Sequence, residues 1–307
     1  MRSILLRSYG GAAAIEAGDA TRPEAGPGQV LVRVRAAGLN ALDWKLREGL
    51  VRDVFPLQLP AVMGIELAGV VEALGSGVSR FQVGDRVMGP LAGIGAYADF
   101  AAVDEAKLVR TPERLSDEAA AALPVAALAA WQSLQHAGPV DAGSRVLVHG
   151  AGGAVGSFAV QFARQAGAFV AATASADDLD YVRELGADRV VDYRAQRFED
   201  LLDDVDLVLA YVGGDVIDRS WQVLKPAGAI VGTSSPDILA RTPEGRRGLW
   251  FVMQPDAARL EAIAADVARG ALKSRVGAVV GFADIPAAIE RNRAGARRGK
   301  VVADFAR

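Results

Sequence analysis

The sequence contains no cysteine and only two histidines, His136 and His149. The lack of cysteine excludes disulfide bonds and any zinc site built on thiolates. Two histidines are too few for the usual ligand set of a catalytic zinc ion, so we expect no metal site. His149 ends a predicted strand, where packing or a hydrogen bond to the backbone explains it better than chemistry.

Long apolar runs and an excess of charge of one sign are also missing. No stretch approaches the roughly 18 consecutive apolar residues of a membrane span. The apolar stretch at the N-terminus is too short for a signal peptide and predicts a strand. The net charge of −3 gives no electrostatic basis for binding nucleic acid. Basic residues gather only between Arg291 and Lys300, where a solvated face is the simpler interpretation. These absences favour a cytoplasmic protein.

A glycine-rich loop stands between a short apolar run and a helical pattern. The run Val146–His149 leads into Gly150, Gly152, Gly153 and Gly156, and apolar residues at helical spacing and a second apolar run follow. A pyrophosphate needs backbone N–H groups at a helix N-terminus with no side chain in the way. The order strand, glycine turn, helix, strand therefore predicts a dinucleotide-binding unit. The spacing is not the strict G-x-G-x-x-G, and the alternative is a tight turn without a ligand.

The end of the second strand bears on the choice of cofactor. A site for NAD places Asp or Glu there to bind the ribose 2′-hydroxyl. This strand ends with Thr173, Ala174 and Ser175, which favours NADPH over NADH because no carboxylate stands at the tip. Ser175 is a candidate donor to the 2′-phosphate. Asp177 and Asp178 follow closely and argue the other way, and Ser175 to Asp178 also fits a helix capping box.

The order of the predicted elements gives an α/β fold with three segments. Residues 1–123 contain many short strands separated by turn signals, as in a small barrel or sandwich. Residues 124–254 alternate strands with helices, which predicts a doubly wound parallel sheet whose last strand is Leu249–Met253. Residues 255–307 are expected to form helix, strand, helix and strand, and to return to the first domain.

Seven segments, in this order, resemble one known family. They are GLNALDWKLREG (38–49), PAVMGIELAGVVEALGSGVSRFQVGDRVMG (60–89), YADFAAV (97–103), LPVAALAAWQSL (123–134), VLVHGAGGAVGSFAVQFAR (146–164), LGADRVVDYR (185–194) and RGKVV (298–302). The chain is similar to the zinc-free medium-chain dehydrogenase/reductases, in the NADPH-dependent quinone oxidoreductase branch that includes zeta-crystallin. The resemblance implies a GroES-like catalytic domain at 1–123, completed by 255–307, and a Rossmann NADPH-binding domain at 124–254. It also implies an active site in the cleft and a homodimer formed through the last Rossmann strand.

The resemblance and the residue types together give a set of candidate site residues. Those expected to bind NADPH are Gly150, Ala151, Gly152, Gly153, Ala154, Val155, Thr173, Ser175, Tyr193, Arg194, Val212, Phe251 and Lys300. Asn40 and Asp43 are the candidates to assist catalysis, with Lys45 as a further candidate for stabilising a developing oxyanion. Asn40 and Asp43 also have the spacing of a helix start, so a cap and a first-turn acid explain both without chemistry.

The expected reaction follows from the expected lack of a metal. A zinc enzyme polarises a carbonyl with its metal ion, whereas a quinone or an α,β-unsaturated ketone delocalises the incoming charge itself. We therefore expect hydride transfer from NADPH to such a conjugated acceptor, with no nucleic acid or membrane partner. The alternatives are an enoyl-thioester reductase, and a non-enzymatic NADPH sensor or nucleic-acid-binding protein. The first domain lacks the basic cluster that the phosphates of a thioester substrate need.

Overall fold

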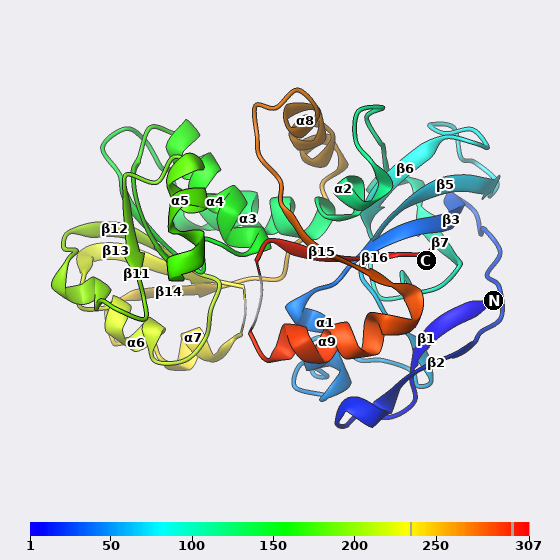
Figure 1. Cartoon of the computed structure of the whole chain (residues 1–307), viewed down its shortest axis with the longest axis horizontal. Coiled ribbons are helices and arrows are strands. Elements are labelled where there is room, and N and C mark those ends of the chain that lie inside the picture. The colour runs from blue at the N-terminus through cyan, green and yellow to red at the C-terminus, as the bar shows by residue number, and fades with distance from the viewer. Residues whose placement is uncertain (234, 296–297, 307) are drawn as a thin grey trace. The chain divides into compact units, whose positions relative to one another are not determined.

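The computed structural model describes residues 1–233, 235–295 and 298–306, which belong to two compact units (Figure 1). Unit 1 consists of Met1–Val125, Pro255–Ala271 and Arg275–Arg307, and unit 2 of Ala126–Gln254 and Leu272–Ser274. The expected boundary after residue 123 lies two residues before the first of these divisions. Residues 255–271 and 275–307 of the tail belong to unit 1, and residues 272–274 belong to unit 2.

Unit 1 is built on two sheets. Its strands are β1 (Arg2–Leu6), β2 (Ile15–Asp19), β3 (Gln29–Gly38), β4 (Ala61–Val62), β5 (Glu66–Leu74), β6 (Arg86–Pro90), β7 (Phe100–Asp104), β8 (Val109–Arg110), β15 (Val276–Gly281) and β16 (Lys300–Asp304). The larger sheet has the order β15-β16-β3-β5-β6-β8, with β7 also paired to β3, and the smaller has the order β2-β1-β4. All of these pairs are antiparallel except β15 with β16. The C-terminal strand β16 therefore lies against β3, next to the start of α1.

Helices and short 3-10 turns complete unit 1. They are α1 (Ala41–Arg47), α2 (Asp117–Ala121), α8 (Ala257–Ala268), α9 (Ile285–Arg293), and the 3-10 turns at Ala12–Ala14, Glu105–Lys107 and Phe282–Asp284. The Ser116 hydroxyl accepts the backbone N–H of Ala119 at 3.2 Å, so it caps α2. The core joins the N-terminal strands to the tail, since Ile4, Val32 and Ile289 are all fully buried in one apolar cluster.

Unit 2 contains the predicted parallel sheet. Its strands are β9 (Arg145–His149), β10 (Phe169–Ala174), β11 (Arg189–Asp192), β12 (Val205–Ala210), β13 (Leu224–Gly232) and β14 (Arg247–Trp250), in the order β11-β10-β9-β12-β13-β14. Every pair is parallel, which confirms the doubly wound prediction. The expected last strand, Leu249–Met253, is wrong by several residues. The strand ends at Trp250 because that residue pairs with Gly232, the last residue of β13.

The helices of unit 2 lie on both faces of this sheet. They are α3 (Pro124–Ala137), α4 (Ala154–Gln165), α5 (Leu179–Glu184), α6 (Val216–Ser220) and α7 (Asp237–Ala240), with 3-10 turns at Ala176–Asp178 and Phe198–Asp200. Figure 1 shows α4 and α5 on one side of the sheet and α6 and α7 on the other. The strand order reverses between β9 and β12, and ligands of such sheets bind at the carboxyl ends of the strands at this point. No helix in the described part of the chain is long and apolar enough to cross a bilayer.

Candidate functional site

The glycine loop lies at the carboxyl end of β9, directly before α4. Gly150 has φ +75°, and a Cβ there would come within 2.9 Å of the Val212 side chain. A Cβ on Gly156 would lie 2.2 Å from the Gly150 carbonyl oxygen, so only glycine lets α4 begin this close to the strand. Gly153 is the N-cap and has no side chain to fill the helix end. The loop is thus a cradle of backbone N–H groups that fits a pyrophosphate.

His149 and Thr173 brace this loop from below. The backbone carbonyl of Thr173 accepts the N–H of Ala151 at 3.1 Å. The side-chain hydroxyl of Thr173 lies 3.0 Å from Nδ1 of His149. Nε2 of His149 lies 3.0 Å from the Ser220 hydroxyl, which donates to the Val216 carbonyl at 2.6 Å. Ser220 can therefore only accept from His149, so this network assigns the proton to Nε2. Burial, the largest cause, lowers the pKa of His149 to about 3, and the nearby Arg219 adds to this.

The end of β10 differs from the sequence expectation in one respect. The Ser175 hydroxyl donates to Oδ2 of Asp178 at 3.2 Å, and neither residue makes a side-chain cap bond to the helix that follows. The capping box that was the alternative explanation of this pair is therefore wrong. Asp178 is 3 % exposed, and its carboxylate lies against Gly152 of the glycine loop.

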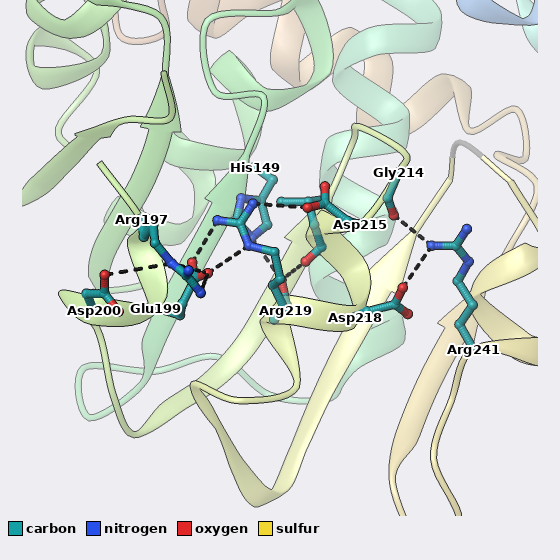
Figure 2. Close-up of polar contacts among 11 residues, drawn as sticks. His149, Arg197, Glu199, Asp200, Gly214, Asp215, Asp218, Arg219 and Arg241 are labelled. Atoms are coloured by element: carbon teal, nitrogen blue, oxygen red, sulfur yellow. Dashed lines mark hydrogen bonds and ion pairs between the residues drawn. The ribbon is translucent and has the colours of Figure 1, made fainter. Parts of the chain in front are cut away.

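Tyr193 and Arg194, after β11, line an open hollow of about 320 Å³ together with Arg197, Asp215 and Arg219. Figure 2 shows how the other charges of this region are arranged, with Arg219 between Glu199 and Asp215. Arg219 forms two hydrogen bonds of 2.8 and 2.7 Å with the Glu199 carboxylate.

The pairing of charges leaves one arginine distinct in this hollow. The pKa of Glu199 is lowered to about 2, chiefly by its hydrogen bonds from Arg219, and Arg197 also pairs with Glu199, at 2.9 Å. The Arg194 guanidinium has no ion pair among the described residues and lies 5.6 Å from the centre of the Tyr193 ring. Tyr193 is 55 % exposed. Arg194 is therefore the cation of this hollow that an anionic ligand can use most directly.

The other two apolar candidates of unit 2 have different surroundings. Val212 follows β12, is 39 % exposed and packs toward Gly150. Phe251 is buried, and its ring stacks on that of His136 with centroids 4.2 Å apart. Of these two residues, Val212 is the more exposed, and it lies next to Gly150.

Asn40, Glu66 and Lys300 form a buried polar cluster in unit 1. The Asn40 amide donates to Oε1 of Glu66 at 2.8 Å and to the Gly38 carbonyl at 3.2 Å, and its Oδ1 accepts from the Lys300 ammonium at 2.6 Å. Lys300 also forms an ion pair with Glu66, whose second oxygen accepts the N–H of Val125 at 2.7 Å. Lys300 thus lies with the catalytic candidates, and its charge is used by Glu66. Lys300 is buried, so it is not part of the solvated basic face expected between Arg291 and Lys300. Arg297, another residue of that basic cluster, lies outside the described residues.

Asp43 and Tyr97 extend this cluster and are both fully buried. The Tyr97 hydroxyl donates to Oδ2 of Asp43 at 2.6 Å, and the N–H of Asn40 donates to the same oxygen at 2.7 Å, which is the return half of a capping box. Burial, the largest cause, raises the pKa of Asp43 to about 6, although the bonds from Tyr97 and Asn40 and the charge of Lys300 lower it. Its Oδ1 has no hydrogen-bond partner among the described residues. Lys45 is half-buried, with its ammonium 5.4 Å from the centre of the Trp44 ring.

Sequence reasoning missed Tyr97 as a member of this cluster. Its ring packs against Gly64, which has φ +93°, and a Cβ on Gly64 would come within 2.5 Å of that ring. The available signal was the tyrosine that opens the segment YADFAAV (97–103), since a buried tyrosine hydroxyl usually has a partner. Among the described residues, no group of three or more His, Cys, Asp or Glu side chains is placed to hold a metal ion.

Comparison with known proteins gives matches over both units. The family model described as "Alcohol dehydrogenase GroES-like domain" matches residues 26–113, and that described as "Zinc-binding dehydrogenase" matches residues 185–302. A quinone oxidoreductase of Pseudomonas aeruginosa is 36% identical over 238 residues, 75% of this chain and 72% of that protein. A chloroplast envelope quinone oxidoreductase homologue of Arabidopsis thaliana is 37% identical over 63% of this chain, and the match spans 61% of the relative's length.

Solved structures match the whole chain. The quinone oxidoreductase of Coxiella burnetii has a TM-score of 0.93 at 30% identity and covers 99% of both chains. An NAD-dependent alcohol dehydrogenase has a TM-score of 0.88 at 30% identity, covering 99% of this chain and 100% of its own. A mycobacterial protein complexed with NADPH has a TM-score of 0.86 at 27% identity, with the same coverage.

The fold and the glycine cradle define a two-domain protein with a GroES-like unit and a Rossmann unit. The chain belongs to the medium-chain dehydrogenase/reductase superfamily, in the group of the quinone oxidoreductases and their homologues.

Proposed function

We propose that the protein is an NADPH-dependent oxidoreductase that transfers a hydride to a quinone or an α,β-unsaturated carbonyl without a metal ion. The observation that carries this proposal is the loop from Gly150 to Val155, with glycine at 150, 152 and 153, at the switch point of the sheet, which fits the pyrophosphate of a dinucleotide. The bound nicotinamide would supply the hydride. The similarity to quinone oxidoreductases and to a protein solved with NADPH supports the choice of acceptor and carrier.

Different residues of unit 2 would bind different parts of NADPH. The backbone of Gly150, Ala151, Gly152, Gly153, Ala154 and Val155 would hold the pyrophosphate, and Val212 would pack beside it. Tyr193 and Arg194 would bind the 2′-phosphate, because Arg194 has no carboxylate partner within the described part of the chain. Thr173 would support the loop, because its carbonyl accepts the N–H of Ala151. Phe251 would contribute through its ring, which stacks on that of His136.

The polar residues of unit 1 would assist the acceptor. The amide and carbonyl groups of the Asn40 side chain are fully used by Gly38, Glu66 and Lys300. We therefore assign Asn40 and Lys300 to a supporting role, and Lys45 to direct stabilisation of the developing oxyanion. Asp43 would hold a proton beside Tyr97, since burial raises the pKa of its carboxyl to about 6.

A matched substrate panel tests the reaction. NADPH consumption should occur with 1,4-benzoquinone and with an α,β-unsaturated ketone, and should be absent with the saturated ketone of the same skeleton. The Lys45→Met variant should lower kcat for the enone by roughly 10-fold or more, while Lys107→Met, which removes a lysine paired with Asp104, should not. Activity only with an enoyl thioester, or NADPH binding without turnover of any acceptor, would contradict this assignment.

We also propose a cytoplasmic homodimer. β14 is an edge strand of the six-stranded sheet, so its unpaired side is able to pair with a second copy across a two-fold axis. Sedimentation should give a dimer, and a charge introduced by Leu249→Lys should weaken it. Cell fractionation tests the location.

A further inference from the structure

We propose that Arg241 is a positioning residue of the NADPH site, and that it holds the loop 212–215 in the place that NADPH requires. The inference rests on the proposed function, because it concerns how a loop beside the glycine cradle is kept ready for the same carrier. Arg241 acts through this loop and is assigned no contact with NADPH itself.

The loop 212–215 joins β12 to α6 at the carboxyl end of the parallel sheet. Its first residue, Val212, lies next to the cradle, since a Cβ on Gly150 would come within 2.9 Å of the Val212 side chain. The next two residues are Gly213 and Gly214, and a Cβ on either would meet no atom within 4 Å. Gly214 has φ +92°. Side-chain packing therefore does not restrict this tip, and glycine has more backbone freedom than any other residue.

Arg241 supplies the restraint that the tip lacks. Its guanidinium donates to the Gly214 carbonyl at 2.7 Å and to Oδ2 of Asp218 at 3.2 Å, and Figure 2 shows it between these two groups. Within the described part of the chain, the bond from Arg241 is the only hydrogen bond to the backbone of residues 212–214. A hydrogen bond from a cation is stronger than one between neutral groups, so this contact can order the tip.

The backbone that carries Arg241 is itself fixed. Arg241 directly follows α7, and its N–H donates to the Asp237 carbonyl at 3.1 Å. Ile238 of the same helix is completely buried in an apolar cluster of unit 2. The Arg241 side chain, by contrast, is 38 % exposed, so replacing it leaves the core intact.

The far end of the loop is attached less firmly. Nη1 of Arg219 lies 3.4 Å from Oδ2 of Asp215, whereas the two shorter bonds of Arg219 go to Glu199. Without Arg241 the tip would be free to move between Val212 and Asp215. NADPH would then have to order the loop on binding, which costs conformational entropy and lowers the affinity.

Calorimetric titration of the full chain with NADPH tests the inference without relying on turnover. Arg241→Gln should weaken NADPH binding by about 3- to 10-fold. Arg241→Lys keeps a cationic donor and should stay within about twofold of the unchanged protein. The matched control is Arg189→Gln, which removes an exposed arginine that donates to the Leu201 carbonyl, also at 2.7 Å, where β11 begins. It should cost similar stability in urea and leave NADPH binding unchanged.

Two further measurements distinguish positioning from general stabilisation. In the protein without carrier, the amide order parameters of Gly213 and Gly214 should fall from about 0.85 to below about 0.6 in Arg241→Gln. In turnover with 1,4-benzoquinone, the KM for NADPH should rise in this variant while kcat changes by less than about twofold.

The outcomes separate this inference from the proposed function. If the unchanged protein does not bind NADPH, the proposed function fails, and the order parameters still test the restraint by Arg241. If it binds NADPH with the same affinity as Arg241→Gln, only the inference fails. An equal loss of affinity in Arg189→Gln would also overturn it. Asp218→Asn should change NADPH binding by less than about twofold; tighter binding would mean that Arg241 contacts the NADPH phosphates directly.

Discussion

The ammonium group of Lys300 donates a 2.6 Å hydrogen bond to Oδ1 of Asn40, a residue 260 positions earlier in the chain. The contact forms because β16 lies beside β3, with Val302 opposite Gly38. Lys300 also neutralises Glu66, which is completely buried. The first catalytic candidate of the N-terminal segment is therefore held in place by the last strand of the chain.

We expect Lys300→Met to lower the free energy of unfolding by about 3–5 kcal/mol, because it leaves the Glu66 carboxylate buried without its partner. Adding Glu66→Gln to this variant should recover part of the loss. Urea denaturation of the single and double variants measures both. Lys273→Met breaks an exposed pair with Glu184 and should cost less than about 1 kcal/mol. Equal losses at Lys300 and Lys273 would contradict the assigned role.

Asp43 should make the protein less stable as the pH rises. Its pKa in the folded chain is about 6, above the ordinary value of 3.8, so the folded state holds a proton that the unfolded state has lost between these values. The contribution of Asp43 to the free energy of unfolding is fully present below pH 3.8. It falls as the pH rises through 6, by up to about 1.4 kcal/mol per pH unit.

Asp43→Asn is neutral at every pH, so its stability relative to the unchanged protein should increase from pH 4 to about pH 7. Denaturation midpoints at a series of pH values measure this difference. The exposed Asp53 provides the control, since Asp53→Asn should show a constant difference. A constant difference for Asp43→Asn as well would argue that Asp43 ionises normally.

His149 should act in the opposite sense. Its folded pKa of about 3 lies below the ordinary 6.5, so its contribution is present above pH 6.5 and is lost as the pH falls toward 3. His149→Gln should flatten this acid limb of the stability curve of unit 2. The only other histidine, His136, is exposed, and His136→Gln should leave the limb unchanged. Both variants are compared by urea denaturation at several pH values.

Gly156→Ala should damage the glycine cradle. The added methyl would meet the Gly150 carbonyl at 2.2 Å, so the loop must move, at a cost of typically 1–3 kcal/mol. We expect NADPH affinity to fall by about 10-fold or more. Gly143→Ala, in the turn before β9, meets its nearest atom at an ordinary 3.5 Å and should bind NADPH normally. Calorimetric titration distinguishes the two, and unchanged affinity in Gly156→Ala would show that the loop has room to adjust.

Sequence patterns were sufficient for the Rossmann unit because its signals are local. The apolar run of β9, the glycines after it and the helical spacing of α4 are contiguous, so strand, loop and helix follow in order. Boundaries that depend on neighbours were less accurate. The strand expected at Leu249–Met253 is observed at Arg247–Trp250, where its residues pair with β13 as far as Gly232.

Only part of the polar cluster of unit 1 could be predicted from the sequence. The spacing of Asn40 and Asp43 predicts a helix start, which α1 confirms. Their contacts with Glu66, Tyr97 and Lys300 depend on the register of separate strands, which no local pattern encodes. The same holds for Asp178, whose side chain contacts a loop 26 positions earlier. Catalytic roles for Asn40, Asp43 and Lys45 remain proposals, as do the cofactor contacts.

The placement of β16 between β15 and β3 has a consequence for synthesis on the ribosome. Unit 2 is complete once Ser274 has been added, whereas the larger sheet of unit 1 lacks two of its strands until the final residues emerge. We therefore expect the nucleotide-binding half to fold first during translation, with the N-terminal half waiting, its Glu66 carboxylate unpaired, for the arrival of Lys300.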